Sequence, residues 1–197
     1  YRRGPGAFTL QLAVEGGLPW TSEAATRSST VHLGGTFEEI AHGEREILAG
    51  RLPDRPFVLV FQQYLADPNR SAGNIHPIDT YAHVPHGYTG DATEAILARI
   101  EQFAPGTRER IVGMETTSPQ ALESWNRNFV GGDILTGSVG IPRILSGPRA
   151  SLNPYAVGIP GVFICSAATP PGPGAHGMCG HGAAAAAIQH LTNAGKL

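Results

Sequence analysis

The residues with the clearest chemical pattern lie in the segment GVFICSAATPPGPGAHGMCGHGAAAAAI at residues 161–188. The pattern predicts a short apolar strand, a glycine-rich turn and an alanine-rich helix. Gly172, Gly174 and Gly177 have the G-x-G-x-x-G spacing of turns that bind dinucleotide phosphates. Three interpretations are open: a dinucleotide-binding turn, a different cofactor contact, or a tight strand-to-helix corner without a ligand.

The dinucleotide-binding turn matches the surrounding residues poorly. In that motif the first glycine follows the strand almost at once, and an acidic residue about 20 positions later holds a ribose. Here Thr169, Pro170 and Pro171 separate the expected strand from Gly172, and no Asp or Glu follows Asp133. The segment therefore does not fit the classical ADP-binding turn.

The remaining features suit a ligand with electron-rich oxygens. Glycines let the backbone approach a ligand closely because no Cβ stands in the way. A helix that begins near Gly177 presents unpaired N–H groups and the positive end of its dipole. Small residues from Gly180 to Ala187 would let this helix pack against a sheet or a flat ring system. The pyrimidine edge of a flavin carries such oxygens, while a ligand-free corner stays the alternative.

The histidines do not predict a metal site. His83 and His86 are separated by a proline, and no third ligand is evident near them. His176 and His181 miss the i, i+4 spacing of a helical metal pair. His176 lies in the glycine-rich turn and is the better candidate for ligand binding or proton handling. No Ser-His-Asp order and no pair of catalytic carboxylates stands out, so the catalytic residues are unknown.

The cysteines and large aromatic residues are expected to be structural. Cys165 and Cys179 form no C-x-x-C pair, so they allow at most one disulfide and predict no zinc site. Cys165 falls in the expected apolar strand and should lie in the core. Cys179 has no resolving cysteine nearby in sequence, which argues against a redox role. Trp20, Tyr81 and Trp125 are expected in the core, with the wall of an apolar substrate cleft as the alternative.

The composition limits the classes of protein to which the chain can belong and the kinds of partner it can bind. A length of 197 residues with 41% hydrophobic and 15% charged residues suffices for one packed domain or two small lobes. A net charge of −2 gives no reason to expect nucleic acid as a partner. Neither a signal peptide nor an apolar run of ~20 residues is evident, which favours a cytoplasmic location. The sequence has no initiator Met and soon enters an apolar strand, which suggests a piece of a longer protein.

Strands and helices elsewhere in the chain must position the glycine-rich turn and the other candidate residues. Alternation of apolar and polar residues, or β-branched and aromatic composition, predicts strands at residues 7–14, 29–35, 57–64, 76–84 and 109–117. The third and fourth of these strands are expected to pair antiparallel across a turn-rich loop. Helix-start signals and apolar spacing predict helices at residues 36–48, 91–103 and 119–128.

The caps and the order of these elements also predict the fold class. Thr36 with Glu39, and Asp91 with Glu94, have the spacing of capping boxes at helix starts. Residues 130–161 are rich in Gly and Pro and predict an irregular excursion over the surface or along a cleft. Strands mixed with a few helices, without regular βαβ alternation, favour an α+β fold with a mostly antiparallel or mixed sheet.

Several segments together resemble one flavoprotein family. GIPGVFICSAATPPGPGAHGMCGHGAAAAA resembles the C-terminal signature of phytoene-desaturase-like (carotenoid dehydrogenase-like) flavoproteins. This family belongs with the amine-oxidase-type FAD oxidoreductases and includes the pyridine nucleotide-disulfide oxidoreductase domain 2 group. Six further segments resemble that group's substrate domain, in the same order: YRRGPGAFTLQLAVEGGLPW, TVHLGGTFEEI, DPNRSAG, YAHVP, IEQFAPG and NFVGGDI. The resemblance extends over nearly the whole chain.

The resemblance implies a domain division and a set of FAD contacts. Residues 1–150 would be a portion of the substrate-binding domain, and residues 151–197 the C-terminal strand, turn and helix of the FAD-binding domain. Many amine-oxidase relatives have an acidic residue at the position of Ala167, so one ribityl contact is missing here. The residues implied near the ribityl and diphosphate are Ser166, Ala167 and Ala168, and those near the isoalloxazine ring are Gly174, Ala175, His176, Gly177 and Met178.

The resemblance also implies a function and partners. The N-terminal ADP-binding Rossmann half of the family is absent from this sequence, so FAD would be held weakly and this part alone would be inactive. The complete enzyme would dehydrogenate an apolar, isoprenoid-type substrate through FAD. Expected partners are the missing half, the substrate, a membrane surface in peripheral contact and a second copy in a homodimer. The alternatives are a non-catalytic lipid- or protein-binding module and a flavin-dependent isomerase.

Overall fold

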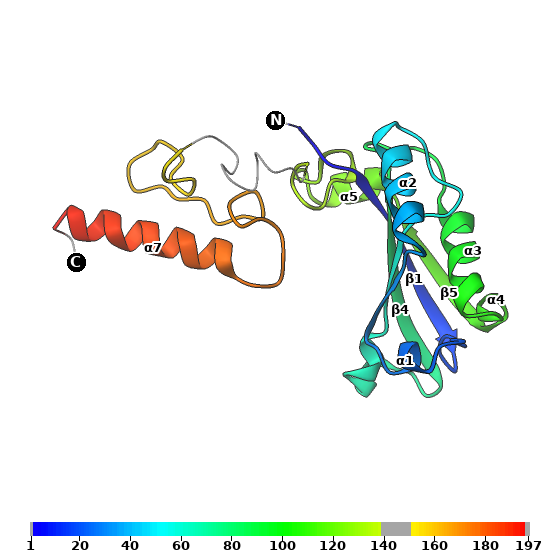
Figure 1. The fold of residues 1–197 in the computed structure, drawn as a ribbon. Coiled ribbons are helices and arrows are strands. Elements are labelled where there is room, and N and C mark those ends of the chain that lie inside the picture. Colours follow the sequence, from blue (N-terminus) through cyan, green and yellow to red (C-terminus); the bar gives the residue numbers. More distant parts are fainter. Residues whose placement is uncertain (1, 139–150, 196–197) are drawn as a thin grey trace. The chain divides into compact units, whose positions relative to one another are not determined.

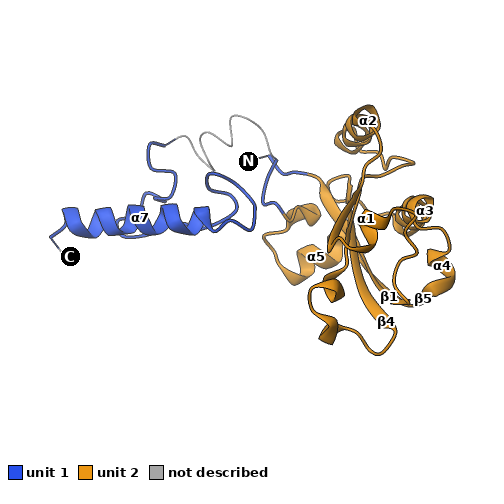
Figure 2. Ribbon diagram, turned by 60° about the horizontal axis from the view of Figure 1, so that its bottom comes forward, with its two compact units in different colours: residues 1–4, 135–197 blue, residues 5–134 orange. Residues whose placement is uncertain are grey.

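The computed structural model describes residues 2–138 and 151–195 (Figure 1). The chain divides into two compact units, which Figure 2 shows in different colours. Unit 1 consists of residues 1–4 and 135–197, and unit 2 consists of residues 5–134. The glycine-rich segment lies in unit 1, and every predicted strand before it lies in unit 2.

Unit 2 is built on a five-stranded antiparallel sheet (Figure 1). Its strands run in the spatial order β2-β3-β4-β1-β5. β1 and β4 pair along their whole length, from Gly6 opposite Val84 to Glu15 opposite Ile75. The predicted α+β class and the antiparallel pairing of β3 with β4 are confirmed. The bounds are β1 Gly6–Glu15, β2 Thr30–Leu33, β3 Val58–Phe61, β4 Ile75–Val84 and β5 Ile111–Thr117.

One face of this sheet carries the hydrophobic core. Side chains alternate along a strand, so Leu10 and Val14 of β1 are both fully buried on the same face. Helix α3, Thr93–Phe103, packs Ile96 and Ile100 against them. Each such side chain contributes about 1.5–3 kcal/mol of hydrophobic stabilisation. The core fills this face, which leaves the opposite face of the sheet open to other contacts.

The helices of unit 2 begin mostly where their capping residues predict. α2, Phe37–Leu48, starts with the predicted capping box, in which Thr36 and Glu39 bond each other's backbone N–H groups. α5, Pro119–Trp125, starts after Ser118, whose side chain accepts from the next turn. Shorter helices are α1 Glu23–Thr26, α4 Thr107–Arg110 and the 3-10 helices η1 Gln63–Leu65, η2 Pro68–Arg70 and η3 Val130–Gly132.

Two local predictions for unit 2 are wrong. The capping box at Asp91 and Glu94 does not form, because α3 begins later, after Ala92. The Asp91 carboxylate instead accepts a hydrogen bond from the backbone N of Thr93 at 2.8 Å, which closes a tight local turn. The second concerns the large aromatic residues. Trp20 packs against the core as predicted, but Trp125 is 79% exposed because it is the last residue of α5, and Tyr81 is half-buried on the sheet face opposite the core.

Unit 1 contains the C-terminal helix α7, Met178–Asn193, which follows Gly177 as the sequence predicts. The strand expected at residues 161–167 is wrong, since that segment forms only a single bridge, between Phe163 and Ala156. A strand needs a ladder of hydrogen bonds to a neighbour, and residues 151–160 supply just this one bridge. Cys165, expected in the core, is exposed for the same reason. None of the helices in the described ranges is long and apolar enough to cross a membrane.

Candidate functional site

The glycine-rich segment of unit 1 encloses a hollow of about 270 Å3. Most of the residues predicted to contact FAD line this hollow, and their role in binding FAD stays a prediction. Ala168, Ala175 and Met178 are not among its lining residues. Those that do line it are Ser166, Ala167, Gly174, His176 and Gly177.

Consecutive turns hold this segment in place. The carbonyl oxygen of Ser166 accepts hydrogen bonds from both the backbone N and the Oγ1 of Thr169. Thr169 is 1% exposed, and its own carbonyl oxygen accepts from the backbone N of Gly172 at 2.9 Å. The Ser166 hydroxyl oxygen accepts from the backbone N of Ala168 and keeps its O–H as a donor. Thr169 is therefore the buried anchor of the turn.

The backbone conformation explains why glycine occupies these positions. Gly172 and Gly177 have φ angles of 108° and 67°, a region that disfavours residues with a Cβ. A Cβ built at either position would meet no atom within 4 Å, so the space beside both is open. A Cβ at Gly174 would instead lie 2.7 Å from Cδ2 of His176. Gly174 therefore allows the imidazole of His176 to lie close to the turn.

His176 is tied to the start of α7. Its Nδ1 accepts a hydrogen bond from the backbone N of Met178 at 3.0 Å. In the neutral ring the proton is then on Nε2, which makes Nε2 a donor at the edge of the hollow. His176 takes the N–H of Met178, and the N-cap residue Gly177 has no side chain. The N–H groups of Cys179 and Gly180 in the first turn of α7 are therefore further donors at the same end. This end of the unit is suited to hydrogen-bond acceptors.

Both cysteines line the same hollow, and both thiols are free. The Sγ of Cys179 lies 3.4 Å from the carbonyl oxygen of Thr169 and 3.3 Å from that of Gly172. The thiol of Cys179 thus helps to hold the turn, while Cys165 is exposed. Within residues 2–138 and 151–195, no three His, Cys, Asp or Glu side chains are placed to hold a metal ion.

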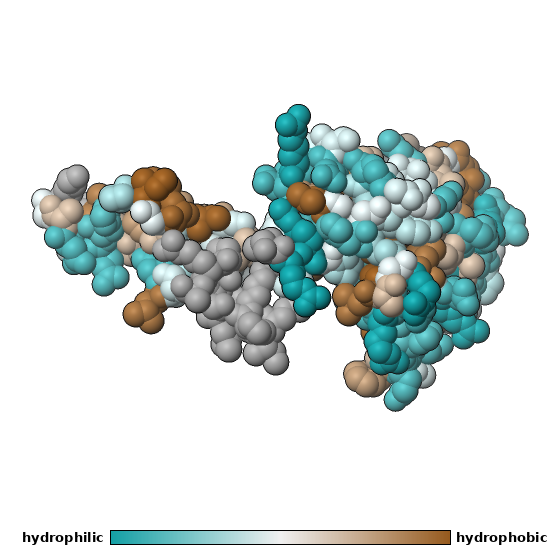
Figure 3. Space-filling model, turned by 90° about the horizontal axis from the view of Figure 1, so that it is seen from above, coloured by the Kyte–Doolittle hydropathy of each residue, from teal (hydrophilic) through white to brown (hydrophobic). Residues whose placement is uncertain are grey.

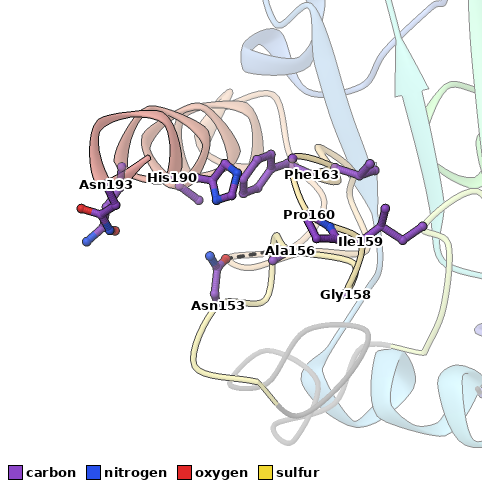
Figure 4. Close-up of a pocket in the computed structure, with 12 residues that line it drawn as sticks. Asn153, Ala156, Gly158, Ile159, Pro160, Phe163, His190 and Asn193 are labelled. Atoms are coloured by element: carbon purple, nitrogen blue, oxygen red, sulfur yellow. Dashed lines mark hydrogen bonds between the residues drawn. The ribbon is translucent and has the colours of Figure 1, made fainter. Parts of the chain in front are cut away.

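A second hollow in unit 1, of about 420 Å3, has no clear signal in the sequence (Figure 4). It lies between the loop of residues 153–163 and the C-terminal half of α7. The rings of Phe163 and His190 meet edge to face, with centroids 5.8 Å apart. Asn153 Oδ1 accepts from the backbone N of Ala156 and folds the loop toward the helix. The lining is apolar on the loop side and carries amide and imidazole groups on the helix side.

Unit 1 buries little of its own apolar surface. Among its described residues, Ala183 is the one apolar side chain that is buried. Figure 3 shows the resulting apolar surface in brown on this unit. Large apolar side chains left exposed in this number are typical of a surface that contacts another part of a protein or a ligand. The large apolar residues exposed here are Leu152, Val157, Ile159, Val162, Met178, Ile188 and Leu191.

A carboxylate–imidazole pair in unit 2 also lies outside the sequence predictions. The Nδ1 of His83, on β4, lies 2.9 Å from Oε1 of Glu44, on α2. His83 alternates with the buried Ala82 and Val84, so it lies on the sheet face opposite the core. The alternation of residues 76–84 predicts this facing for His83, but the approach of Glu44 depends on where α2 packs.

Comparison with known proteins finds two distant relatives. The chain is 24% identical over 190 residues to "Pyridine nucleotide-disulfide oxidoreductase domain-containing protein 2" of Rattus norvegicus, which covers 89% of this chain and 32% of the relative. It is 22% identical over 177 residues to the protein of the same name from Mus musculus, which covers 83% of this chain and 30% of the relative. The chain thus spans about a third of the length of the curated relatives it matches. No family model matches it.

Proposed function

We propose that this chain is the C-terminal part of an FAD-dependent oxidoreductase, and that the turn before α7 contacts the flavin. The distant similarity to a pyridine nucleotide-disulfide oxidoreductase domain protein supports the oxidoreductase class. The observation that carries the flavin contact is the smaller hollow of unit 1, which gathers the turn glycines with Ser166 and His176. The activity that we propose for the complete protein is dehydrogenation of an apolar, isoprenoid-type substrate.

The groups around this hollow fit the oxygen-rich edge of a flavin. The donors are Nε2 of His176, the hydroxyl of Ser166 and the N–H groups of Cys179 and Gly180 in the first turn of α7. The open space beside Gly172 and Gly177 would let a flat ring approach the backbone. A bound flavin supplies the redox chemistry, and these residues would bind it, orient it and stabilise negative charge on it through the helix N-terminus.

The described residues of unit 1 form almost no hydrophobic core, which supports the further proposal that another domain covers this unit. Among residues 2–4, 135–138 and 151–195 of this unit, Ala183 is the one buried apolar residue, which is too little buried surface for these residues to be stable by themselves. We propose that the rest of an FAD-binding domain, from the longer polypeptide seen in the relatives, covers the exposed apolar residues of unit 1. Unit 2, which has a core of its own, would then be the substrate-binding part.

Flavin retention by the full-length protein tests the proposal. Gly172→Val places a side chain in the hollow, and Gly195→Val is a matched control at the far end of α7. Both glycines have positive φ angles, of 108° and 65°, and a Cβ at either meets no atom within 4 Å. We expect Gly172→Val to weaken flavin binding by about tenfold or more, measured by visible absorbance per protein after dialysis, because a side chain would block the ring. The control should retain flavin.

Two results would contradict the proposal. One is a folded full-length protein without flavin, which would favour the non-catalytic lipid- or protein-binding module. That alternative is supported by the hydrophobic core of unit 2, because a unit with its own core can fold and bind a partner by itself. The other is equal flavin retention by both valine variants, which would move the contact away from this turn. A flavin-loaded protein that rearranges its substrate without net oxidation would indicate the isomerase.

A further inference from the structure

The sheet of unit 2 has a second face, opposite the core, that takes no part in the proposed flavin contact. Residues directly opposite each other in register share a face, so His32, Leu59 and Tyr81 form one row across β2, β3 and β4. Phe61 and His83 lie on the same face, two positions along their strands. We call these five residues the outer face. All of them retain solvent exposure, in contrast to the fully buried side chains of the core face.

The outer face has an apolar, aromatic strip. The rings of Phe61 and Tyr81 are stacked, with an angle of 18° between their planes and their centroids 6.2 Å apart. The rings of Tyr81 and His83 follow at 6.0 Å with a tilt of 45°. Aromatic rings in such an arrangement offer a rigid apolar surface at little entropic cost. The strip leads from the phenyl ring of Phe61 to the imidazole of His83.

The polar end of this strip is chemically defined. An ionised carboxylate only accepts hydrogen bonds, so His83 must carry a proton on Nδ1, where it faces Glu44 at 2.9 Å. In the neutral ring Nε2 is then an acceptor, and no described residue donates to it. Burial, and secondarily the charge of Glu44, raises the pKa of the Tyr81 phenol, which keeps its O–H in place at neutral pH. An acceptor nitrogen therefore ends an aromatic strip.

We propose that the outer face binds an apolar ligand carrying a hydroxyl group, which donates a hydrogen bond to Nε2 of His83. The apolar part of the ligand lies on the rings of Tyr81 and Phe61. The proposal rests on the proposed function in treating unit 2 as the substrate-binding part, and it names the class of substrate: an apolar alcohol.

Charge and hydration together favour a hydroxyl end group over a carboxylate or an ammonium group. A carboxylate end group would have no proton to donate at neutral pH. Glu44, beside His83, and Asp79, directly opposite Phe61 on the same sheet face, would repel it. An ammonium group could donate and would be attracted by these carboxylates, but its strong hydration makes transfer onto a half-buried aromatic strip costly. A hydroxyl group donates one hydrogen bond and loses little hydration. The outer face is thus complementary to an alcohol.

The test uses four probes with one carbon skeleton: geraniol, geranic acid, geranylamine and the parent hydrocarbon. Their binding to the 197-residue chain, without flavin, is followed by NMR through the side-chain 15N signal of His83 and the ring signals of Tyr81. We expect geraniol to bind at least about tenfold more tightly than the acid and to shift the Nε2 signal in the direction of hydrogen bonding. This measurement on the unaltered chain does not depend on any variant folding.

Two variants and a control separate the hydrogen bond from the apolar contact. His83→Ala should weaken geraniol binding about threefold to tenfold, the effect of losing one neutral hydrogen bond, and leave the hydrocarbon unaffected. Glu44→Gln can still accept from Nδ1 but carries no charge, so it should improve binding of geranic acid. His181→Ala, at an exposed position of α7 outside the outer face, should change nothing.

The outcomes keep the two proposals apart. If geraniol and the hydrocarbon bind equally, or if geranylamine binds best, the alcohol assignment is overturned. If no probe shifts Tyr81 or His83 while the full-length protein retains flavin, the outer-face proposal fails and the proposed function stands. If geraniol binds as expected but the full-length protein lacks flavin, the ligand site stands and the oxidoreductase proposal fails.

Discussion

At the scale of single residues, Gln62 shows how one buried amide attaches a loop to the sheet. Its side chain is 1% exposed and lies just after β3. Its Oε1 accepts from Nε1 of Trp20 at 2.9 Å, and its Nε2 donates to the carbonyl oxygens of Ala25 at 2.9 Å and Ser28 at 2.7 Å. A buried polar group is costly unless it is hydrogen-bonded, and here both amide atoms are.

Gln62→Leu is therefore expected to destabilise unit 2. Leucine fills a similar volume but leaves the indole N–H and two carbonyl oxygens without this partner, a loss of about 2–3 kcal/mol. Urea unfolding followed by far-UV circular dichroism measures it. Gln11→Leu is the control, since its amide bonds only the side chains of Thr9 and Thr117 on a half-buried surface. An equal loss of unfolding free energy in the two variants would show that the three hydrogen bonds of Gln62 stabilise unit 2 no more than those of Gln11.

Residue-scale features were predictable when their cause is local in sequence. The glycine spacing and the helix start put Gly174 and His176 in one turn, while Ser166 came only from the family resemblance, and the structure gathers all three around one hollow. The Glu44–His83 pair joins residues 39 positions apart, and it depends on how α2 packs beside β4. Such a pair has no signature in a single sequence, because neither residue type nor spacing along the chain indicates the approach.

At the scale of elements, α2 offers a test of its capping box. The backbone N–H of Thr36 donates to the Glu39 carboxylate at 2.8 Å, and this bond is the main reason that the pKa of Glu39 is lowered. A carboxylate with a lowered folded-state pKa stabilises the fold above its unfolded pKa. That contribution disappears as the pH falls through the folded pKa.

Glu39→Gln should therefore destabilise the chain at pH near 7, and the difference from the unaltered chain should shrink on acidification below about pH 4. Glutamine can still complete a capping box, so the variant removes the charge and keeps the hydrogen-bond geometry. Urea unfolding at both pH values measures the change, and the lowered pKa values of Glu46 and Asp91 are common to both proteins and cancel. A difference that is constant with pH would contradict the assignment.

Elements with strong periodicity or explicit caps were predicted, and elements that need a distant partner were not. The alternation of β1 and β4 gave both strands to within a residue or two, and Thr36 located α2. Residues 161–167 are as apolar as a strand, yet they form one bridge, because strand formation depends on a pairing neighbour rather than on composition. Composition also could not show that β1 lies between β4 and β5.

At the scale of the whole molecule, stability is concentrated in unit 2. Apart from Ala183, every buried apolar side chain among the described residues belongs to this unit. The local free energy of opening follows buried apolar contacts, so the two units should differ widely in it. The exposed apolar residues of unit 1 would gain protection only when another part of the protein covers them.

Hydrogen exchange measures this difference directly. The central amides of β1 and β4 are expected to exchange slowest, and those of α7 about a hundredfold faster or more. In the full-length protein the protection of α7 should rise while that of β1 stays unchanged, because the covering domain would act on unit 1. Protection of α7 equal to that of β1 in the 197-residue chain would show that unit 1 is stable without a partner.

The pairing of β1 has a consequence for biosynthesis. β1 lies between its neighbours in the sheet but precedes both in the chain, since Leu10 pairs with Thr80 on one side and Thr116 on the other. During synthesis, β1 leaves the ribosome before either neighbouring strand has been made. Its apolar side chains therefore have no neighbouring strand to pack beside at that stage. Contacts between residues so distant in sequence form slowly. The nascent chain thus presents an apolar strand without a pairing partner until β4 has been synthesised, and we expect chaperones that bind extended apolar segments to act on it during that interval.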